Sequence, residues 1–131
     1  MKTGAEYAAQ AKSSAYNKLK YSQVDCQAFC ELVLSDIGVR QENGRAYNWK
    51  GYNDMARHAV SWIGTKEECI AQFGFIPLGA WAFIWDNTGN EKQRGYYDGL
   101  GNYSHIGIYV GDNTVRAISR VVPAPCKNIV P

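Results

Sequence analysis

The sequence has no long apolar run. No segment approaches the roughly 20 consecutive apolar residues that a membrane-spanning helix needs. Residues 1–6 (MKTGAE) lead into a polar, alanine-rich stretch and not into the apolar core of a signal peptide. We therefore expect no membrane span, no signal peptide and synthesis in the cytoplasm.

An excess of charge of one sign is also missing. The 131 residues carry 14 basic and 12 acidic side chains, and the two signs are interspersed. Nucleic-acid binding usually requires a basic stripe that neutralises phosphates, so we expect no nucleic-acid partner. The hydrophobic fraction of 46% is sufficient for one core at this length. We predict a single domain over residues 1–131.

Close cysteine pairs are absent as well. Without a secretory signal, the four cysteines are more readily free thiols, metal ligands or a nucleophile than a disulfide framework. Structural zinc sites usually use C-x2-C pairs, whereas Cys26 and Cys30 stand four residues apart on one predicted helix face, without a second pair. We expect no metal and no cofactor; zinc bound by cysteines and histidines is the alternative.

The spacing of apolar residues changes along the chain. The first part has helical spacing, with Asp25 as an N-cap, Gly38 as a stop signal and a capping box at residues 65–68. From Leu78 onward the apolar runs have strand length. Helices are predicted at 5–20, 25–38, 54–63 and 65–73, strands at 78–85, 105–110 and 115–122, and loops at 40–53 and 86–104. Helices followed by an antiparallel sheet indicate an α+β class.

Cys26 stands in the first turn of a predicted helix. The helix dipole and the unpaired N–H groups there stabilise a thiolate, which lowers the pKa of a nucleophilic cysteine. His105 opens a predicted strand far along the chain, as expected when a nucleophile and its base meet only in space. A small apolar cysteine and a histidine bonded to a carbonyl are the alternatives. The other histidine, His58, is expected to pack or to face water.

Three short motifs surround these residues: DCQAF at 25–29, IPLGAWAF at 76–83 and SHIGIYVG at 104–111. In the same order, they resemble the D-C-S-G-F, P-G-D-L-V-F-F and S-H-V-G-I-Y-L-G motifs of the NlpC-like cell-wall peptidases, small papain-like cysteine enzymes. Residues 48–51 (NWKG) and 64–70 (GTKEECI) are similar to a branch found on phages and prophages of Gram-positive bacteria.

This resemblance implies a papain-like NlpC fold, in which N-terminal helices pack on a small antiparallel sheet. It implies a cysteine endopeptidase that hydrolyses peptidoglycan stem peptides, commonly after D-glutamate, with Cys26 as the nucleophile and His105 as the base. The implied partners are the peptidoglycan peptide and phage tail or lysis components. The protein would then act at the cell wall after release or phage delivery.

Aromatic residues gather in two predicted loops, at 47–52 and 96–103. Tyrosine and tryptophan offer a flat apolar face with a polar edge, which suits an extended, partly polar peptide. We expect Trp49, Tyr97 and Tyr103 to bind the substrate. The alternative is that these side chains only cover the core.

The resemblance also predicts a polar residue, on the strand after His105, that orients the imidazole. Arg116 occupies that place. A two-residue turn at 112–113 would pair Arg116 with Tyr109, on the sheet face of His105. Because a guanidinium has no acceptor, we expect Arg116 not to orient the imidazole.

An acceptor must then come from elsewhere. A backbone carbonyl of the second strand, the hydroxyl of Ser119 and the carboxylate of Asp98 are the candidates. The part of the chain from about residue 117 is expected to be diverged or truncated relative to the family. Two other functions therefore stay open: a catalytically impaired wall-binding or phage tail-structural protein, and a CHAP-like amidase that cuts the sugar-to-peptide linkage.

Overall fold

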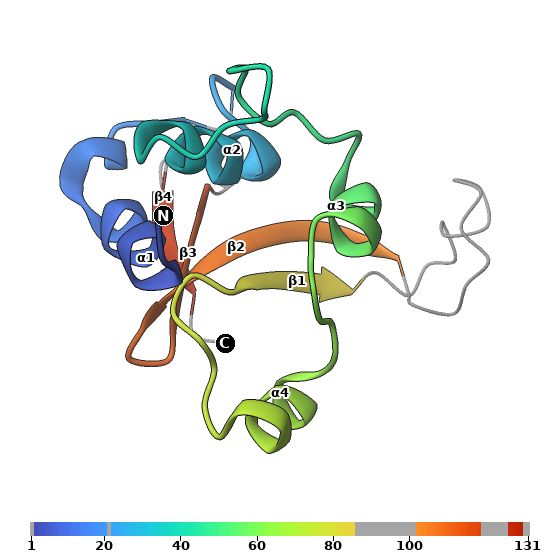
Figure 1. Cartoon of the computed structure of the whole chain (residues 1–131). Helices are drawn as coiled ribbons and strands as arrows, with labels where there is room; N and C mark the ends of the chain where they lie inside the picture. The colour runs from blue at the N-terminus through green and yellow to red at the C-terminus, as the bar shows by residue number, and fades with distance from the viewer. Residues whose placement is uncertain (1, 21, 86–101, 119–125, 130–131) are drawn as a thin grey trace.

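The structure, a computed structural model, describes residues 2–20, 22–85, 102–118 and 126–129. Within these residues the chain forms four α-helices, one 3-10 turn and one antiparallel sheet with the strand order β1-β2-β3-β4 (Figure 1). The elements are α1 (Gly4–Lys12), η1 (Ser14–Tyr16), α2 (Cys26–Asp36), α3 (Tyr52–His58), α4 (Lys66–Phe73), β1 (Trp81–Trp85), β2 (Tyr103–Gly111), β3 (Thr114–Ile118) and β4 (Cys126–Ile129). Helices followed by antiparallel strands confirm the predicted α+β class.

Helices α1 and α2 cover one face of the sheet, whereas α4 lies beyond β1 (Figure 1). Every second residue of β2 from Ile106 to Val110 is apolar and buried against the α1–α2 layer. From α2, the fully buried Phe29 and Val33 join the same cluster. Each side chain of this kind contributes about 1.5–3 kcal/mol when it is buried. The contact between α2 and β2 therefore ties the N-terminal helices to the sheet.

The first helix is shorter than the predicted 5–20. Helix α1 ends at Lys12 because Ser13 is extended (φ −65°, ψ 160°) and a 3-10 turn follows. Serine side chains compete for backbone hydrogen bonds and so favour helix ends. The turn directs Tyr16 into the core, where its ring packs edge-on against Phe29 with centroids 5.3 Å apart. Burial raises the pKa of Tyr16 to about 12.

The predicted cap signals of two helices are confirmed. Asp25 caps α2 by accepting a hydrogen bond from the backbone N–H of Ala28 at 2.7 Å. Gly38 follows this helix with a φ of +83°, a conformation that favours glycine. In front of α4, Thr65 and Glu68 make both bonds of the capping box.

Helix α3 spans 52–58, instead of the predicted 54–63. Its N-terminal end lies two residues earlier, directly after Gly51, which has a φ of +139°. Residues 59–65 leave the helix and include Val60 and Ile63, whose branched side chains lower helix propensity. The side chains of this segment line a cavity beside β1 instead of continuing the helical turn.

The strands also differ from their predicted bounds. Strand β1 begins at Trp81 and not at residue 78, because residues 77–80 form a turn in which Gly79 has a φ of +84°. Strand β2 begins two residues earlier than predicted, at Tyr103, within the expected loop. The described part of β3 ends at Ile118; residues 86–101 and 119–125 lie outside the described residues.

Strand β4 was not predicted. It spans Cys126–Ile129 and pairs antiparallel with β3, Val115 opposite Ile129 and Ile118 opposite Cys126. The chain after residue 117 was expected to be diverged or truncated relative to the family. It nevertheless supplies a strand at the edge of the sheet.

The expected pairing of Arg116 with Tyr109 is wrong. The two-residue turn forms, with Asp112 and Asn113 both at positive φ (53° and 55°). A bulge after Tyr109 shifts the register, so that Ile108 pairs with Arg116. Directly opposite residues share a sheet face. Arg116 therefore lies on the core face with Ile108, and not on the alternate face of β2.

On the core face, Arg116 closes the end of α1. Its guanidinium donates to the carbonyl oxygens of Lys12 and Ser13, both at 2.9 Å, and to the side-chain oxygen of Asn17. The last carbonyls of a helix have no partner within the helix, and a buried unpaired carbonyl is costly. Arg116 is itself only 7% exposed. The arginine thus binds the N-terminal helix to β3.

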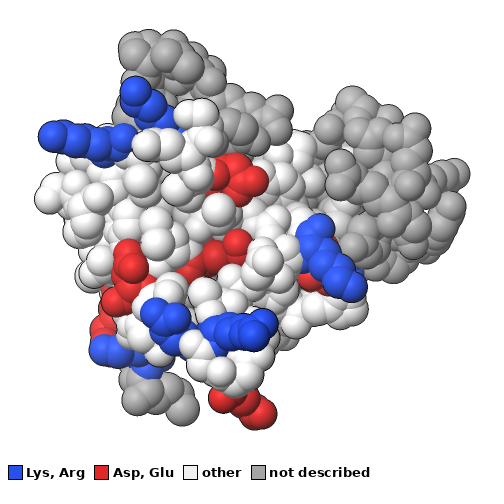
Figure 2. Space-filling model, turned by 90° about the horizontal axis from the view of Figure 1, so that it is seen from above, with Lys and Arg blue, Asp and Glu red and all other residues white. Residues whose placement is uncertain are grey.

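Positive and negative side chains are interspersed over the described part of the face seen from above (Figure 2). This distribution follows the near balance of 14 basic and 12 acidic residues in the sequence. In the part of the chain that the structure describes, no helix has the length and apolar character needed to cross a membrane.

The role of Arg116 can be tested by stability. We expect Arg116→Met to lower the free energy of unfolding by about 1–3 kcal/mol, because the substitution removes the donor to two partly buried carbonyl groups. Urea denaturation measures the change. The matched control is Arg45→Met, which removes an exposed arginine and should change stability by less than about 0.5 kcal/mol. Equal effects of the two substitutions would contradict the capping role.

Candidate active site

Two side chains that are 79 residues apart in sequence meet where α2 begins. Cys26 is the first residue of α2, and His105 lies near the start of β2. The Cys26 Sγ lies 2.9 Å from Nδ1 of His105 and 3.8 Å from Nε2. The structure thus brings together the two residues selected from the sequence, at a separation that permits direct proton transfer.

The sulfur has a second polar contact. Cys26 Sγ lies 3.0 Å from the carbonyl oxygen of Ile118, to which the thiol can donate. A thiol has one proton, so it donates either to this carbonyl or to the imidazole. The N-terminal end of α2 favours negative charge on the sulfur, whereas the carbonyl lone pairs oppose it. Transfer of the proton to Nδ1 would leave a thiolate able to attack a carbonyl carbon.

The start of β2, which carries His105, is held by α3. The buried Asn53 accepts a hydrogen bond from the backbone N–H of Tyr103 at 2.9 Å and donates to the side-chain oxygen of Asn102 at 2.7 Å. Arg57, one turn further along α3, also donates to Asn53. These bonds fix the backbone two residues before His105.

The other cysteines have different surroundings. Cys30 is fully buried one turn further along α2, and burial raises the pKa of its thiol well above the usual value. Cys69 is half-buried on α4. The side chain of Cys126 lies outside the described part of the structure. Among the described residues, no three His, Cys, Asp or Glu side chains are arranged to share a metal ion.

The acceptor that would orient the imidazole is not Arg116, because the register places that residue on the core face and its guanidinium binds the end of α1. With Nδ1 beside the sulfur, Nε2 is the nitrogen that such an acceptor would contact. Two of the proposed acceptors, Ser119 and Asp98, lie outside the described residues.

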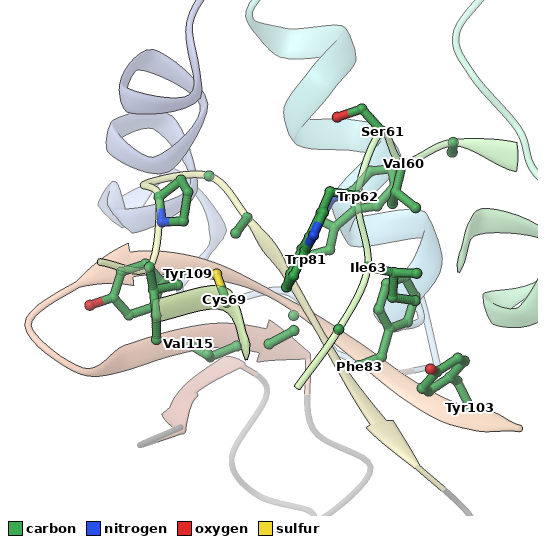
Figure 3. A pocket seen from close by; sticks show the side chains of 18 of the residues that line it. Val60, Ser61, Trp62, Ile63, Cys69, Trp81, Phe83, Tyr103, Tyr109 and Val115 are labelled. Carbon is green, nitrogen blue, oxygen red and sulfur yellow. The ribbon is translucent and has the colours of Figure 1, made fainter. Parts of the chain in front are cut away.

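A cavity of about 1000 Å³ opens beside the imidazole. His105 contributes to its lining, and so do Trp49 and Tyr103, two of the three residues proposed to bind substrate. In Figure 3, Val60 to Ile63, from the connection between α3 and α4, lie across from Trp81 and Phe83 of β1. Tyr97, the third residue proposed to bind substrate, lies outside the described residues.

The aromatic lining is built from ordered ring contacts. Trp49 stacks on Tyr47 with centroids 4.9 Å apart and packs edge-on against Trp81 at 5.3 Å. Phe83 lies between Trp81 and Tyr103, at 6.4 Å and 5.0 Å. The lining is therefore a continuous row of rings that runs from the loop after α2 along β1 to the start of β2, and not a set of isolated side chains.

His58 does not join the Cys26 site. It lies at the rim of the cavity with 70% of its side chain exposed, and its Nε2 is 3.9 Å from the carboxylate of Asp54. His58 therefore faces water, which confirms one of the two predicted alternatives.

Trp81 and Glu31 were not predicted as site residues from the sequence. Trp81 was assigned only to a strand, although it forms the centre of the aromatic row. Glu31 is a carboxylate within the apolar segment of α2, and it is 9% exposed. Burial raises the pKa of Glu31, although hydrogen bonds from Gln27 and the backbone of Trp49 partly oppose the shift. A charged residue amid a helix's buried positions was the signal that could have identified it.

Comparison with known proteins gives little further information. No family model matches the sequence, and no solved structure matches the fold. The chain is 24% identical over 127 aligned residues to a protein of Arabidopsis thaliana named "Beta-amylase 1, chloroplastic"; the match covers 84% of this chain and 22% of that protein. The chain thus spans about a fifth of the length of this relative.

The reactivity of the thiols can be tested by alkylation. Because Cys26 is 1% exposed, the reagent must be small, and we suggest iodoacetamide at mildly acidic pH with peptide mass spectrometry. We expect Cys26 to be labelled before Cys30, Cys69 and Cys126. His105→Ala should slow its labelling, because the substitution removes the base that takes the thiol proton. Faster labelling of Cys69 or Cys126 would contradict the assignment.

The buried carboxylate predicts a dependence of stability on pH. The pKa of Glu31 is raised from its usual 4.5, so the folded protein keeps this proton to a higher pH than the unfolded chain does. The resulting stabilisation is complete below the unfolded pKa and is lost as pH rises through the folded pKa. We expect Glu31→Gln to gain stability relative to the wild type as pH rises above the usual pKa of 4.5, as measured by urea denaturation. The exposed Glu42→Gln is the control, and a gain of equal size there would contradict the explanation.

Proposed function

We propose that the protein is a cysteine endopeptidase of the NlpC-like, papain-like type that hydrolyses peptidoglycan stem peptides. The observation that carries the proposal is the 2.9 Å separation between Cys26 Sγ, at the N-terminal end of α2, and Nδ1 of His105 on β2. The three motifs that resemble this family include both residues and the first strand. A helix layer packed on a small antiparallel sheet is compatible with the papain-like arrangement.

In the proposed reaction, Cys26 and His105 act together in successive steps. Nδ1 of His105 takes the thiol proton as Cys26 Sγ bonds to the carbonyl carbon of the peptide. N–H groups at the N-terminal end of α2 can stabilise the oxyanion. The imidazolium then gives its proton to the leaving amine as the C–N bond breaks, which leaves a thioester. Water, deprotonated by the imidazole, hydrolyses the thioester and restores the thiol.

The cavity suits a peptide substrate. Its row of aromatic rings, which includes Trp49, Trp81 and Tyr103, offers flat faces to an extended main chain, while indole and phenol groups supply polar edges. The family resemblance favours the bond between D-glutamate and the diamino acid. Peptidoglycan is then the partner, and phage tail or lysis components would bring the protein to the cell wall.

The activity can be tested by mass spectrometry of muropeptides incubated with the protein. We expect free stem-peptide fragments ending in D-glutamate, with Cys26→Ser reducing their rate of formation at least 1000-fold, since it removes the nucleophile. Cys69→Ser is the control. Cys69 lines the same cavity but is not the nucleophile, so this variant should retain most of the activity.

Other products would identify other functions. Separation of intact stem peptides from the sugar would indicate a CHAP-like amidase instead of an endopeptidase. Binding to peptidoglycan without any cleavage would indicate a catalytically impaired wall-binding or tail-structural protein. Either result would overturn the proposed endopeptidase activity.

A further inference from the structure

Two side chains of α2 hold the main chain of Trp49. The backbone N–H of Trp49 donates to the Glu31 carboxylate at 2.7 Å, and the backbone carbonyl of Trp49 accepts from Nε2 of Gln27. Gln27 also donates to Glu31 at 3.1 Å. The three residues thus close a ring of hydrogen bonds. Both polar groups of the Trp49 main chain are fixed to the helix that begins with Cys26.

The location of this ring makes it costly to form. Glu31 is buried, and it lies on α2 directly after the fully buried Cys30. An ionised carboxylate is expensive to bury unless hydrogen bonds compensate it. An apolar side chain would fill this site at lower cost, but it could not accept a hydrogen bond from Trp49. The ring therefore fixes a segment that has no regular structure of its own, residues 39–51.

The indole of Trp49 is fixed at the same time. It packs edge-on against Trp81, and Nε1 of Trp81 donates to the hydroxyl of Tyr7 at 3.0 Å. Tyr7 in turn donates to the backbone carbonyl of Cys30 on α2 at 2.9 Å. Both tryptophans, which are in edge-on contact in the cavity lining, are thus tied to α2 by separate sets of hydrogen bonds.

We propose that Gln27 and Glu31 are positioning residues that hold Trp49 as an aromatic wall of the substrate cavity, which His105 also lines. Gln27 directly follows Cys26, so Trp49 and the nucleophile are both attached to the first turn of α2. The wall would bind the flat main chain and aliphatic side chains of an extended peptide. This inference rests on the proposed peptidase function and adds the residues that set its affinity for the peptide.

The test compares Glu31→Leu with the control Glu42→Leu, which removes an exposed carboxylate. With a synthetic stem peptide, we expect Glu31→Leu to raise KM by about 3- to 10-fold, the range expected for losing one aromatic contact, with kcat changed less than about twofold. Glu31→Gln keeps an acceptor for the Trp49 N–H and should largely restore KM. Glu42→Leu should leave both constants unchanged.

A double substitution separates positioning from a general loss of structure. If Glu31 acts through Trp49, then adding Trp49→Ala to Glu31→Leu should raise KM no further than Trp49→Ala alone does. A second readout needs no turnover: hydrogen exchange of the Trp49 amide should be faster in Glu31→Leu than in the wild type. An unchanged exchange rate, or additive effects on KM, would overturn the proposal.

The two proposals can fail separately. If the wild type cleaves the peptide but Glu31→Leu has a normal KM despite a faster amide exchange, the positioning role is wrong and the peptidase function stands. If the wild type does not cleave, the same comparison is made with the dissociation constant of the peptide for the Cys26→Ser form. If Glu31→Leu then binds the peptide more weakly, the result supports the positioning of Trp49 for peptide binding, although no bond is cut. If the affinity is unchanged, or if neither form binds the peptide, the positioning role is overturned.

Discussion

The packing of α2 against β2 is the constraint on which the site depends. Cys26 reaches His105 because Phe29 and Val33, further along the same helix, are locked against Ile106 and the residues that alternate with it on β2. A helix rises about 1.5 Å per residue, so a slide of one residue would take Sγ out of reach of Nδ1. Close-packed interiors resist such slides. The apolar contact thus determines the geometry of a polar pair.

Buried polar side chains then attach the less regular segments to this core. Arg116 binds the end of α1, Asn53 holds the start of β2, and Glu31 holds the main chain of Trp49. In each case a side chain on a regular element satisfies backbone groups at the end of a helix or strand, or in a loop. Because an unpaired buried group costs about 1–3 kcal/mol, each of these bonds restricts where its segment can lie.

Local signals in the sequence were sufficient for part of this structure. The cap at Asp25, the capping box at Thr65 and the α+β order follow from neighbouring residues, and the motifs selected Cys26 and His105. The register of Arg116 could not be predicted, because a bulge inserts one residue and moves the side chain to the other face. Strand β4 was missed because an edge strand of four residues carries little pattern. The ring around Trp49 depends on tertiary contacts between α2 and a loop.

Cys26 and His105 differ in their exposure, and this difference suits the proposed chemistry. Cys26 is 1% exposed, whereas His105 lines the cavity. A proton that leaves the sulfur is therefore received by a group in contact with the substrate cavity, where the leaving amine of a bound peptide would take it. The carbonyl of Ile118, 3.0 Å from Sγ, favours the protonated thiol while the site is empty. The imidazole, 2.9 Å from Sγ, competes with this carbonyl for the proton. In the proposed peptidase the sulfur is therefore nucleophilic to the extent that His105, and not the carbonyl of Ile118, takes the thiol proton.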